Sequence, residues 1–327
     1  MMLAVGAPNS ASARTFQEWC EDQTITAEAR RTVDAVLAAT GAPSCDRLVA
    51  SSVQTLSLIS KGISDLSPLE GLPQLMLLEI GRNNIRDIRP LARLPRLVSL
   101  AMIGNPVENL TPLRDLTGLT KLQFSYVGGT DLSILGGLTR LQEIWIFDSG
   151  QLSVPAADLA VLGGLLELRS IWITIETMGS LNPAIQAIGS LAGLETLIIE
   201  GNTEATDTLD LRPLSGLSQL QRLLLDGAPV IDVSPLASLS GLLHLTVANG
   251  RQLSDLAPLA GLTALTELKL GGNAIQDISP LRGLTNLTSL DLQRYNLVSD
   301  YSALAGMTRL TALRARLTPE NIESFFA

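Results

Sequence analysis

Hydrophobic positions recur in a fixed order along most of the chain. Residues 75–94 and 265–284 both fit the pattern L-x-x-L-x-L-x-x-N-x-I-x-D-x-x-P-L-x-x-L, with Ile replacing Leu at some positions. Successive copies are 22 or 23 residues apart, except for three intervals of 27, 26 and 26 residues that begin at Ile144, Ile171 and Leu197. Self-similarity at this period is typical of a solenoid. The fourth position of each copy is occupied by Leu56, Leu78, Leu100, Leu122, Ile144, Ile171, Leu197, Leu223, Leu245, Leu268, Leu290 and Leu313.

Each part of the repeat predicts a structural element. The L-x-L segment alternates with period two, which predicts a short strand with Leu inward and the middle residue outward. The Asn at position nine can bond to backbone groups where the chain leaves the sheet; it is present as Asn83, Asn105, Asn202 and Asn273. The Asp four residues later predicts the cap of a short helical turn that contains Pro; it is present as Asp65, Asp87, Asp232 and Asp277. One carboxylate per repeat does not provide the six to eight oxygens that calcium takes, so capping is the favoured interpretation.

The predicted fold is therefore an α/β leucine-rich-repeat solenoid. A curved parallel sheet forms its concave side and short helical turns form its convex side. The D-[IL]-x-P-L-x-x-L ending with its 22-residue period resembles the internalin-type class of bacterial leucine-rich repeats, over residues 53–317. This resemblance implies a secreted or surface-displayed protein that binds a partner protein on its concave face. The chain departs from the pattern at position nine, which is Val127, Ser149, Glu176, Ala228, Gly250 and Tyr295 in other repeats.

The two ends of a solenoid must be covered, because their hydrophobic layers would otherwise meet water. We expect residues 1–13 to be a flexible tail or a signal-peptide remnant, and residues 14–52 to be a helical cap. In this cap Thr26 begins a helix that runs to about Thr40, Gly41 ends it, and Phe16 and Trp19 pack on the first repeat. Residues 318–327 predict a C-terminal helical cap, in which Ile322, Phe325 and Phe326 cover the last layer.

Both cysteines, Cys20 and Cys45, precede the repeats. Two cysteines in one small segment favour a disulfide that staples the N-terminal cap, over two buried free thiols. A disulfide indicates an oxidising compartment, so we expect a secreted, periplasmic or cell-surface protein. The alternative is a cytoplasmic regulatory scaffold, because similar 22-residue repeats also occur in a phosphatase-regulating family.

Composition narrows the classes of partner. The net charge is −9 and no cluster of Lys and Arg is present, so binding to nucleic acid is not expected. Hydrophobic residues make up 46% of the chain, yet no apolar run approaches the roughly 18 residues that span a membrane. We expect no membrane insertion and no cofactor. The remaining partner class is another protein. Because the chain is acidic, a partner with a basic surface is favoured.

The outward strand positions show where a partner would bind. The middle outward column is polar at both ends and apolar at its centre, where Trp145, Trp172, Ile198 and Leu224 lie on four consecutive strands. We name these four residues together with Phe147 the central patch. An apolar centre with a charged rim is typical of a protein-binding hot spot. The predicted binding site comprises Trp145, Trp172, Ile198, Leu224, Phe147, Tyr126, Glu143, Glu200, Arg222 and Asp226, with Lys121 close by.

Other interpretations of the same residues are open. Aromatic and β-branched neighbours also stabilise sheets by cross-strand packing, and the patch could serve self-association.

The single histidine, His244, has no metal-ligand or catalytic partner pattern, so we expect neither a metal site nor an enzyme. Glu200 and Asp226 are the only neighbouring carboxylates that an enzyme could use.

The three long intervals predict convex helices at residues 155–162 and 183–191 and a local change of curvature.

Overall fold

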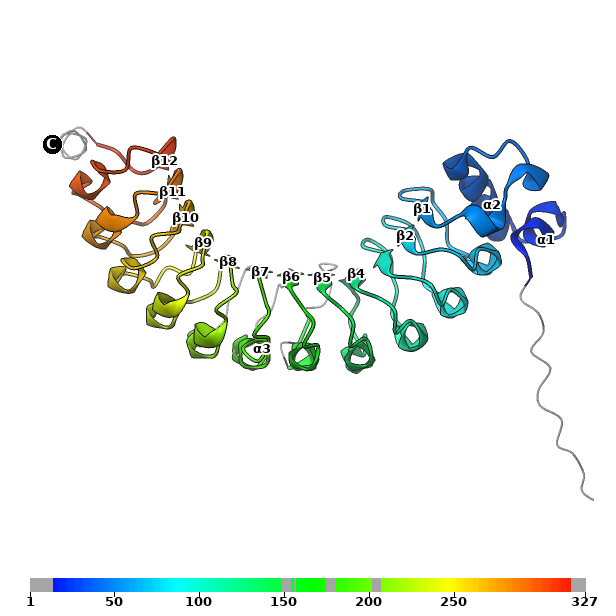
Figure 1. Ribbon diagram of the computed structural model, residues 1–327, viewed down its shortest axis with the longest axis horizontal. Coiled ribbons are helices and arrows are strands. Elements are labelled where there is room, and N and C mark those ends of the chain that lie inside the picture. Colours follow the sequence, from blue (N-terminus) through cyan, green and yellow to red (C-terminus); the bar gives the residue numbers. More distant parts are fainter. Residues whose placement is uncertain (1–13, 149–153, 156, 175–179, 202–206, 319–327) are drawn as a thin grey trace, which may run out of the picture.

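The computed structural model describes residues 14–148, 154–155, 157–174, 180–201 and 207–318. Among them, twelve strands form one parallel sheet in which every strand pairs with its neighbour in the sequence. The chain is a leucine-rich-repeat solenoid whose sheet lines the concave side of an arc (Figure 1). The strands are β1 (Thr55–Ser57), β2 (Leu77–Glu79), β3 (Ser99–Ala101), β4 (Lys121–Tyr126), β5 (Glu143–Asp148), β6 (Ser170–Thr174), β7 (Thr196–Glu200), β8 (Arg222–Asp226), β9 (His244–Ala248), β10 (Glu267–Lys269), β11 (Ser289–Asp291) and β12 (Ala312–Arg314).

The convex side consists mainly of short 3-10 helices. In seven of the repeats the helix has Pro in its first turn, and a side chain two residues before the helix accepts a hydrogen bond from the first N–H of the helix. This acceptor is Asp in six of the repeats, as between Asp277 and Ser279 at 2.8 Å, and Asn109 in the seventh. The predicted capping role of the Asp column is therefore confirmed. These helices, with two in the cap, are η1 (Cys45–Arg47), η2 (Ala50–Ser52), η3 (Ser67–Gly71), η4 (Arg89–Arg93), η5 (Thr111–Asp115), η6 (Leu132–Gly137), η7 (Asp158–Gly164), η8 (Arg212–Gly216), η9 (Ser234–Ser238), η10 (Ala257–Leu259), η11 (Ser279–Gly283) and η12 (Ser302–Leu304).

The repeats with long intervals differ from the others. Strands β4 to β9 have five or six residues, whereas the strands at both ends have three. One of the two predicted convex helices is present as α3 (Asn182–Ile188), whereas the other is the 3-10 helix η7. The arc is flatter from β4 to β7 and bends more strongly beyond β8 (Figure 1). The predicted change of curvature is thus visible as a wider, flatter centre.

The Leu and Ile side chains of successive repeats form one continuous core between the two sides. Buried asparagines close the turn after a strand. Asn105, for example, donates to the carbonyls of Ile80 and Met102 and accepts from the N–H of Ile85. This network satisfies backbone groups that cannot reach water. The buried members of this ladder are Asn83, Asn105, Asn273 and Asn296.

Asn296 corrects the prediction that Tyr295 occupies position nine. The last full repeat has one additional residue after its strand, so the ladder position moves to Asn296 and Tyr295 is displaced to the surface. Asn296 donates to the carbonyls of Leu270 and Leu292 and accepts from the N–H of Ile275, in the same way as Asn105 bonds in its own repeat. Ser149, Glu176 and Asn202, which the alignment also places at position nine, lie outside the described residues.

A helical unit covers the first repeat. It contains α1 (Phe16–Glu21) and α2 (Ala27–Thr40). The predicted boundaries of the second helix are confirmed, since Thr26 caps its start and Gly41 ends it with a φ of 71°. Phe16 is buried, and its backbone lies so close to Gly71 that a Cβ there would not fit. Thr32 also donates to the carbonyl of Asp65, which attaches α2 to the first repeat.

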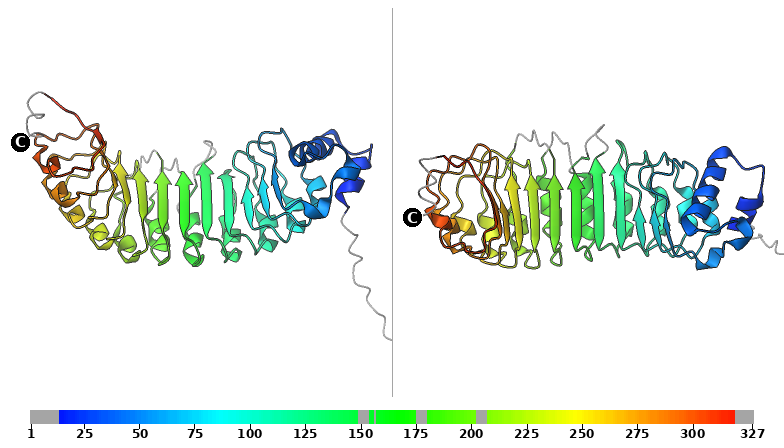
Figure 2. Two further views of the ribbon diagram at one scale, coloured as in Figure 1. Left: turned by 45° about the horizontal axis from the view of Figure 1, so that its top comes forward. Right: turned by 90° about the horizontal axis from the view of Figure 1, so that it is seen from above.

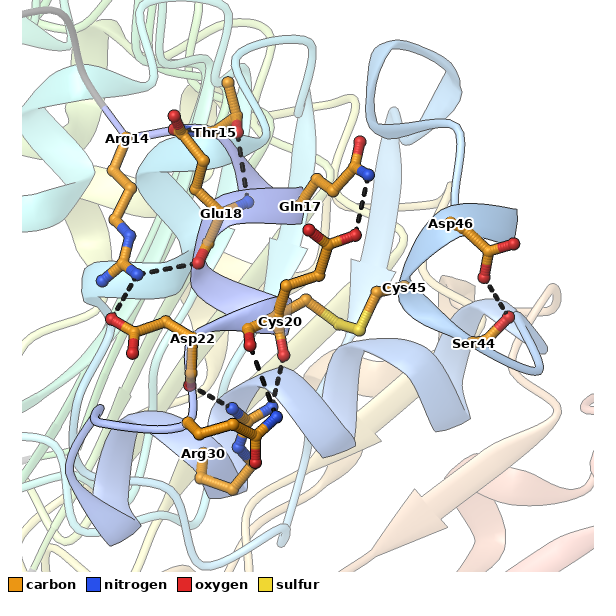
Figure 3. Close-up of a disulfide and its surroundings, with 12 residues drawn as sticks. Arg14, Thr15, Gln17, Glu18, Cys20, Asp22, Arg30, Ser44, Cys45 and Asp46 are labelled. Carbon is orange, nitrogen blue, oxygen red and sulfur yellow. Dashed lines mark hydrogen bonds and ion pairs between the residues drawn. A yellow bond between two sulfur atoms is a disulfide. The ribbon is translucent and has the colours of Figure 1, made fainter.

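The predicted disulfide joins Cys20 of α1 to Cys45, with 5.7 Å between their Cα atoms. The guanidinium of Arg30 donates to the carbonyls of Cys20 and Asp22, and Arg14 pairs with the carboxylate of Asp22 (Figure 3). The pKa of Asp22 is lowered to about 2, and the largest cause is the hydrogen bond that its carboxylate accepts from the Thr24 hydroxyl. The disulfide thus attaches α1 to η1, and the hydrogen bonds of Arg30 attach the end of α1 to α2.

The predicted tail at residues 1–13 and the C-terminal cap residues from Pro319 onward lie outside the described residues. No helix in the described ranges has the length and hydropathy needed to cross a membrane.

Candidate functional site

The central strands lie side by side across the concave face (Figure 2). Their parallel register aligns the outward side chains in three rows. The middle row carries Trp145, Trp172, Ile198 and Leu224, and the parallel register places each beside the next. The flanking rows carry charges on both sides of it, with Glu143 and Arg222 in one row and Glu200 and Asp226 in the other. The sheet therefore brings these predicted site residues together, because every strand has the same register as its neighbours.

The aromatic members of the central patch pack on one another. The ring centroids of Trp145 and Trp172 are 5.0 Å apart, and that of Phe147 lies 5.4 Å from Trp172 and 6.3 Å from Trp145. Tilted and edge-on arrangements at such distances are favourable beyond the apolar area they bury. All three rings are partly exposed. The cluster therefore stabilises the sheet and also leaves apolar surface open to a partner.

Charged groups are coupled directly to this cluster. The Nζ of Lys121 lies 4.9 Å from the ring centroid of Trp145 and 2.9 Å from the Glu143 carboxylate. On the other side, the indole N–H of Trp172 donates to Glu200 at 3.3 Å. Lys121 thus contacts the ring of Trp145 as a cation–π pair, whereas Trp172 turns its polar N–H edge toward a carboxylate.

Two predicted site residues contribute little or no open surface. Tyr126 is only 3% exposed and belongs to the core, so its place in the binding surface is a wrong prediction. On β4 it is in phase with Leu122 and Phe124, and period-two alternation turns all three inward. Ile198 faces outward in the register but is 8% exposed, so it offers a partner far less surface than its neighbours.

The two carboxylates that an enzyme could use have structural partners. Glu200 and Asp226 are register neighbours on β7 and β8. Glu200 accepts from Trp172, and Asp226 accepts from the side-chain amide of Asn249 at 2.6 Å. Within the described ranges, no group of three or more His, Cys, Asp or Glu side chains is placed to hold a metal ion. His244 pairs with Glu267 across adjacent strands at 3.2 Å.

Sequence reasoning missed a second feature of the concave face, at the C-terminal repeats. There a hollow of about 190 Å³ opens between β9 and β12. Lys269, Arg294 and Arg314 lie around it, and Ala248 and Gly271 leave the space unfilled. The available signal was a pair of small residues at matching outward positions of adjacent repeats.

Comparisons with known proteins support the fold. A family model described as leucine-rich repeats, two copies, matches residues 263–306. No curated protein matches the chain. An internalin of Listeria monocytogenes is similar in structure, with 22% identity, a TM-score of 0.58, and coverage of 88% of this chain and 95% of that chain.

Two further solved structures are similar to the chain. A leucine-rich-repeat protein of Leptospira interrogans has 16% identity and a TM-score of 0.51, with 82% of this chain and 85% of that chain covered. The Arabidopsis receptor kinase HAESA, solved with a peptide hormone and a co-receptor, has 16% identity and a TM-score of 0.54, with 83% and 47% covered. At such identities the likeness establishes a shared leucine-rich-repeat solenoid and nothing about the partner.

Proposed function

We propose that this chain is a non-catalytic recognition module that binds a partner protein on its concave face, with the central patch as the main contact. The observation that carries the proposal is the cluster of Trp145, Phe147 and Trp172, whose partly exposed rings lie in the middle of the sheet. Tryptophans surrounded by charged residues are enriched among residues that dominate binding energy. Glu143, Glu200, Arg222 and Asp226 form the rim that would select the partner by charge.

Solenoids of this architecture commonly use the concave sheet for recognition, because it offers a long continuous surface. One of the similar structures, the receptor kinase HAESA, was solved with a peptide hormone bound. The carboxylates Glu200 and Asp226 accept hydrogen bonds from neighbouring side chains, which favours a rim role over acid–base chemistry.

The test is capture of the partner by immobilised protein. We expect Trp145→Ala/Trp172→Ala to lose at least about tenfold in affinity, because hot-spot truncations cost about 2 kcal/mol or more. The matched control is Leu166→Ala, since Leu166 is 68% exposed but lies in the turn before β6, away from the patch. A folded double variant that captures the same partner as tightly as the wild type would refute the patch.

We also propose that the protein works in an oxidising compartment, secreted, periplasmic or at the cell surface. The Cys20–Cys45 disulfide supports this, because such bonds are rare in reducing cytoplasm. Thiol labelling of protein taken from its native host, with and without reduction, tests it. Label incorporated without reduction would favour the cytoplasmic scaffold instead.

A further inference from the structure

The C-terminal hollow is made by missing side chains. The third outward row carries Glu200 on β7 and Asp226 on β8, but Ala248 at the end of β9 and Gly271 after β10. Gln293 continues the row beyond β11. Two small residues side by side therefore leave about 190 Å³ open on the concave face, which is enough for one large side chain.

The hollow is lined mainly by cations, whereas the chain as a whole is acidic. Three cations, Lys269, Arg294 and Arg314, and one carboxylate, Asp291, line it, although the chain carries a net charge of −9. The Arg314–Asp291 pair is long at 3.9 Å, and Lys269 pairs with Glu267 at 2.7 Å. Among the residues that line the hollow itself, the cations outnumber the carboxylates by three to one. Glu267 and Asp226 lie outside this lining, where they bond to Lys269 and Asn249. The hollow therefore attracts an anionic group.

Arg294 is held in place by neutral groups. Its backbone has a φ of 59°, in the left-handed region, and its guanidinium donates to the side-chain oxygen of Asn249 at 3.3 Å. Asn249 is itself fixed by its bond to Asp226. No salt bridge of Arg294 occurs within the described part of the chain, so its charge is not neutralised locally.

The left-handed conformation is a feature of the repeat. Position eight of the repeat, immediately before the ladder position, adopts it in several copies. Glycine, which adopts this conformation without steric cost, fills the position in three of them. Arg82 and Arg294 fill it in two, at opposite ends of the arc. The residues at this position with positive φ are Ser60, Arg82, Gly104, Gly227, Asn249, Gly272 and Arg294. Replacing either Arg by Gly therefore removes a charge without disturbing the turn.

An exposed aromatic residue, Tyr295, directly follows Arg294 in the chain. The additional residue of this repeat places Tyr295 at the surface, where it is 66% exposed, and the guanidinium of Arg251 lies 5.4 Å from its ring centroid. Among the described residues Tyr295 is the only aromatic side chain that is mostly exposed. An anion site with an adjoining flat ring suits a peptide segment better than a small free ion.

We propose that this hollow binds an acidic side chain, Asp or Glu, of a partner polypeptide. Arg294 and Arg314 would pair with its carboxylate through their guanidinium groups, which match carboxylate geometry. Tyr295 would pack beside the neighbouring residue of the partner. This inference rests on the proposed function, because it assigns the chemistry of one contact that the concave face makes with its partner.

The test measures fluorescence anisotropy of a labelled hexaglutamate peptide with the full chain at low salt. A hexaglutamine peptide is the neutral control. We expect hexaglutamate to bind and hexaglutamine not to bind, even though the chain as a whole is acidic. Arg294→Gly should weaken hexaglutamate binding by about tenfold, and Arg314→Gln by a similar factor, because each truncates one charged contact. Arg82→Gly, which changes the same turn position far from the hollow, should leave it unchanged.

Three outcomes would overturn the proposal. These are equal binding of hexaglutamate and hexaglutamine, an unchanged affinity in Arg294→Gly, or an equal loss in Arg82→Gly. Inorganic phosphate that displaces the peptide more effectively than acetate at equal ionic strength would identify a phosphate site instead. Since this peptide assay needs no natural partner, its failure leaves the central-patch proposal standing. Loss of partner capture in Trp145→Ala/Trp172→Ala likewise says nothing about the hollow.

Discussion

The central patch and the C-terminal hollow occupy the same sheet but are made in opposite ways. The central patch exists because Trp145, Phe147 and Trp172 add large rings that pack on one another. The hollow exists because Ala248 and Gly271 omit side chains where neighbouring strands carry them. A surface built from added rings is also part of the packing of the protein. A hollow left by absent side chains does not contribute to the packing, so substitutions around it can alter its charge with little effect on the fold.

The largest expected effect tests whether the rings of the central patch contribute to the stability of the fold. Trp172→Ala should lower the free energy of unfolding by about 3 kcal/mol, at the lower end of aromatic-to-alanine losses because the ring is partly exposed. Thr246→Ala, in the same outward row on β9, should change it by less than about 0.5 kcal/mol. Urea denaturation followed by circular dichroism measures both. Equal, small losses would show that the rings contribute only to binding.

A second prediction compares a buried asparagine of the ladder with an exposed asparagine at the edge of the hollow. Asn296→Ala should cost about 2 kcal/mol, because it leaves the carbonyls of Leu270 and Leu292 without their buried donor. Asn249→Gly, at the exposed edge of the hollow, should cost less than about 1 kcal/mol, because water replaces its partners and Gly adopts the positive φ of this position without strain. The same denaturation experiment compares the two variants. A smaller loss in Asn296→Ala than in Asn249→Gly would contradict the corrected ladder, in which the additional residue moves Tyr295 outward.

The contrast between the two regions also explains what could be predicted from sequence. The 22-residue period predicts the strands, their register and the capping Asp column, since each follows from local chemistry repeated many times. The central patch was predictable because Trp145 and Trp172 are conspicuous at equivalent positions. Tyr126 lies near the patch in the repeat alignment, but the period-two alternation of β4 turns it inward together with Phe124. The hollow depends on space between repeats, which no single residue marks.

The smallest expected effect is on the pH dependence of stability near the hollow. A hydrogen bond from Lys269 is the main cause that lowers the pKa of Glu267, and His244 contributes less. A folded-state pKa below its unfolded value means that the carboxylate stabilises the fold above its ordinary pKa, and that this stabilisation is lost as the pH falls through the folded-state value. The free energy of unfolding of the wild type should therefore fall more between about pH 5 and pH 3 than that of Glu267→Gln, since the ordinary pKa of Glu is about 4.3. The Asp residues with lowered pKa values before the convex helices are shared by both proteins, so the difference between their slopes reports Glu267 alone. Parallel slopes would mean that Lys269 is not committed to Glu267 in solution and adds its full charge to the hollow, which would strengthen the hollow's attraction for an acidic partner.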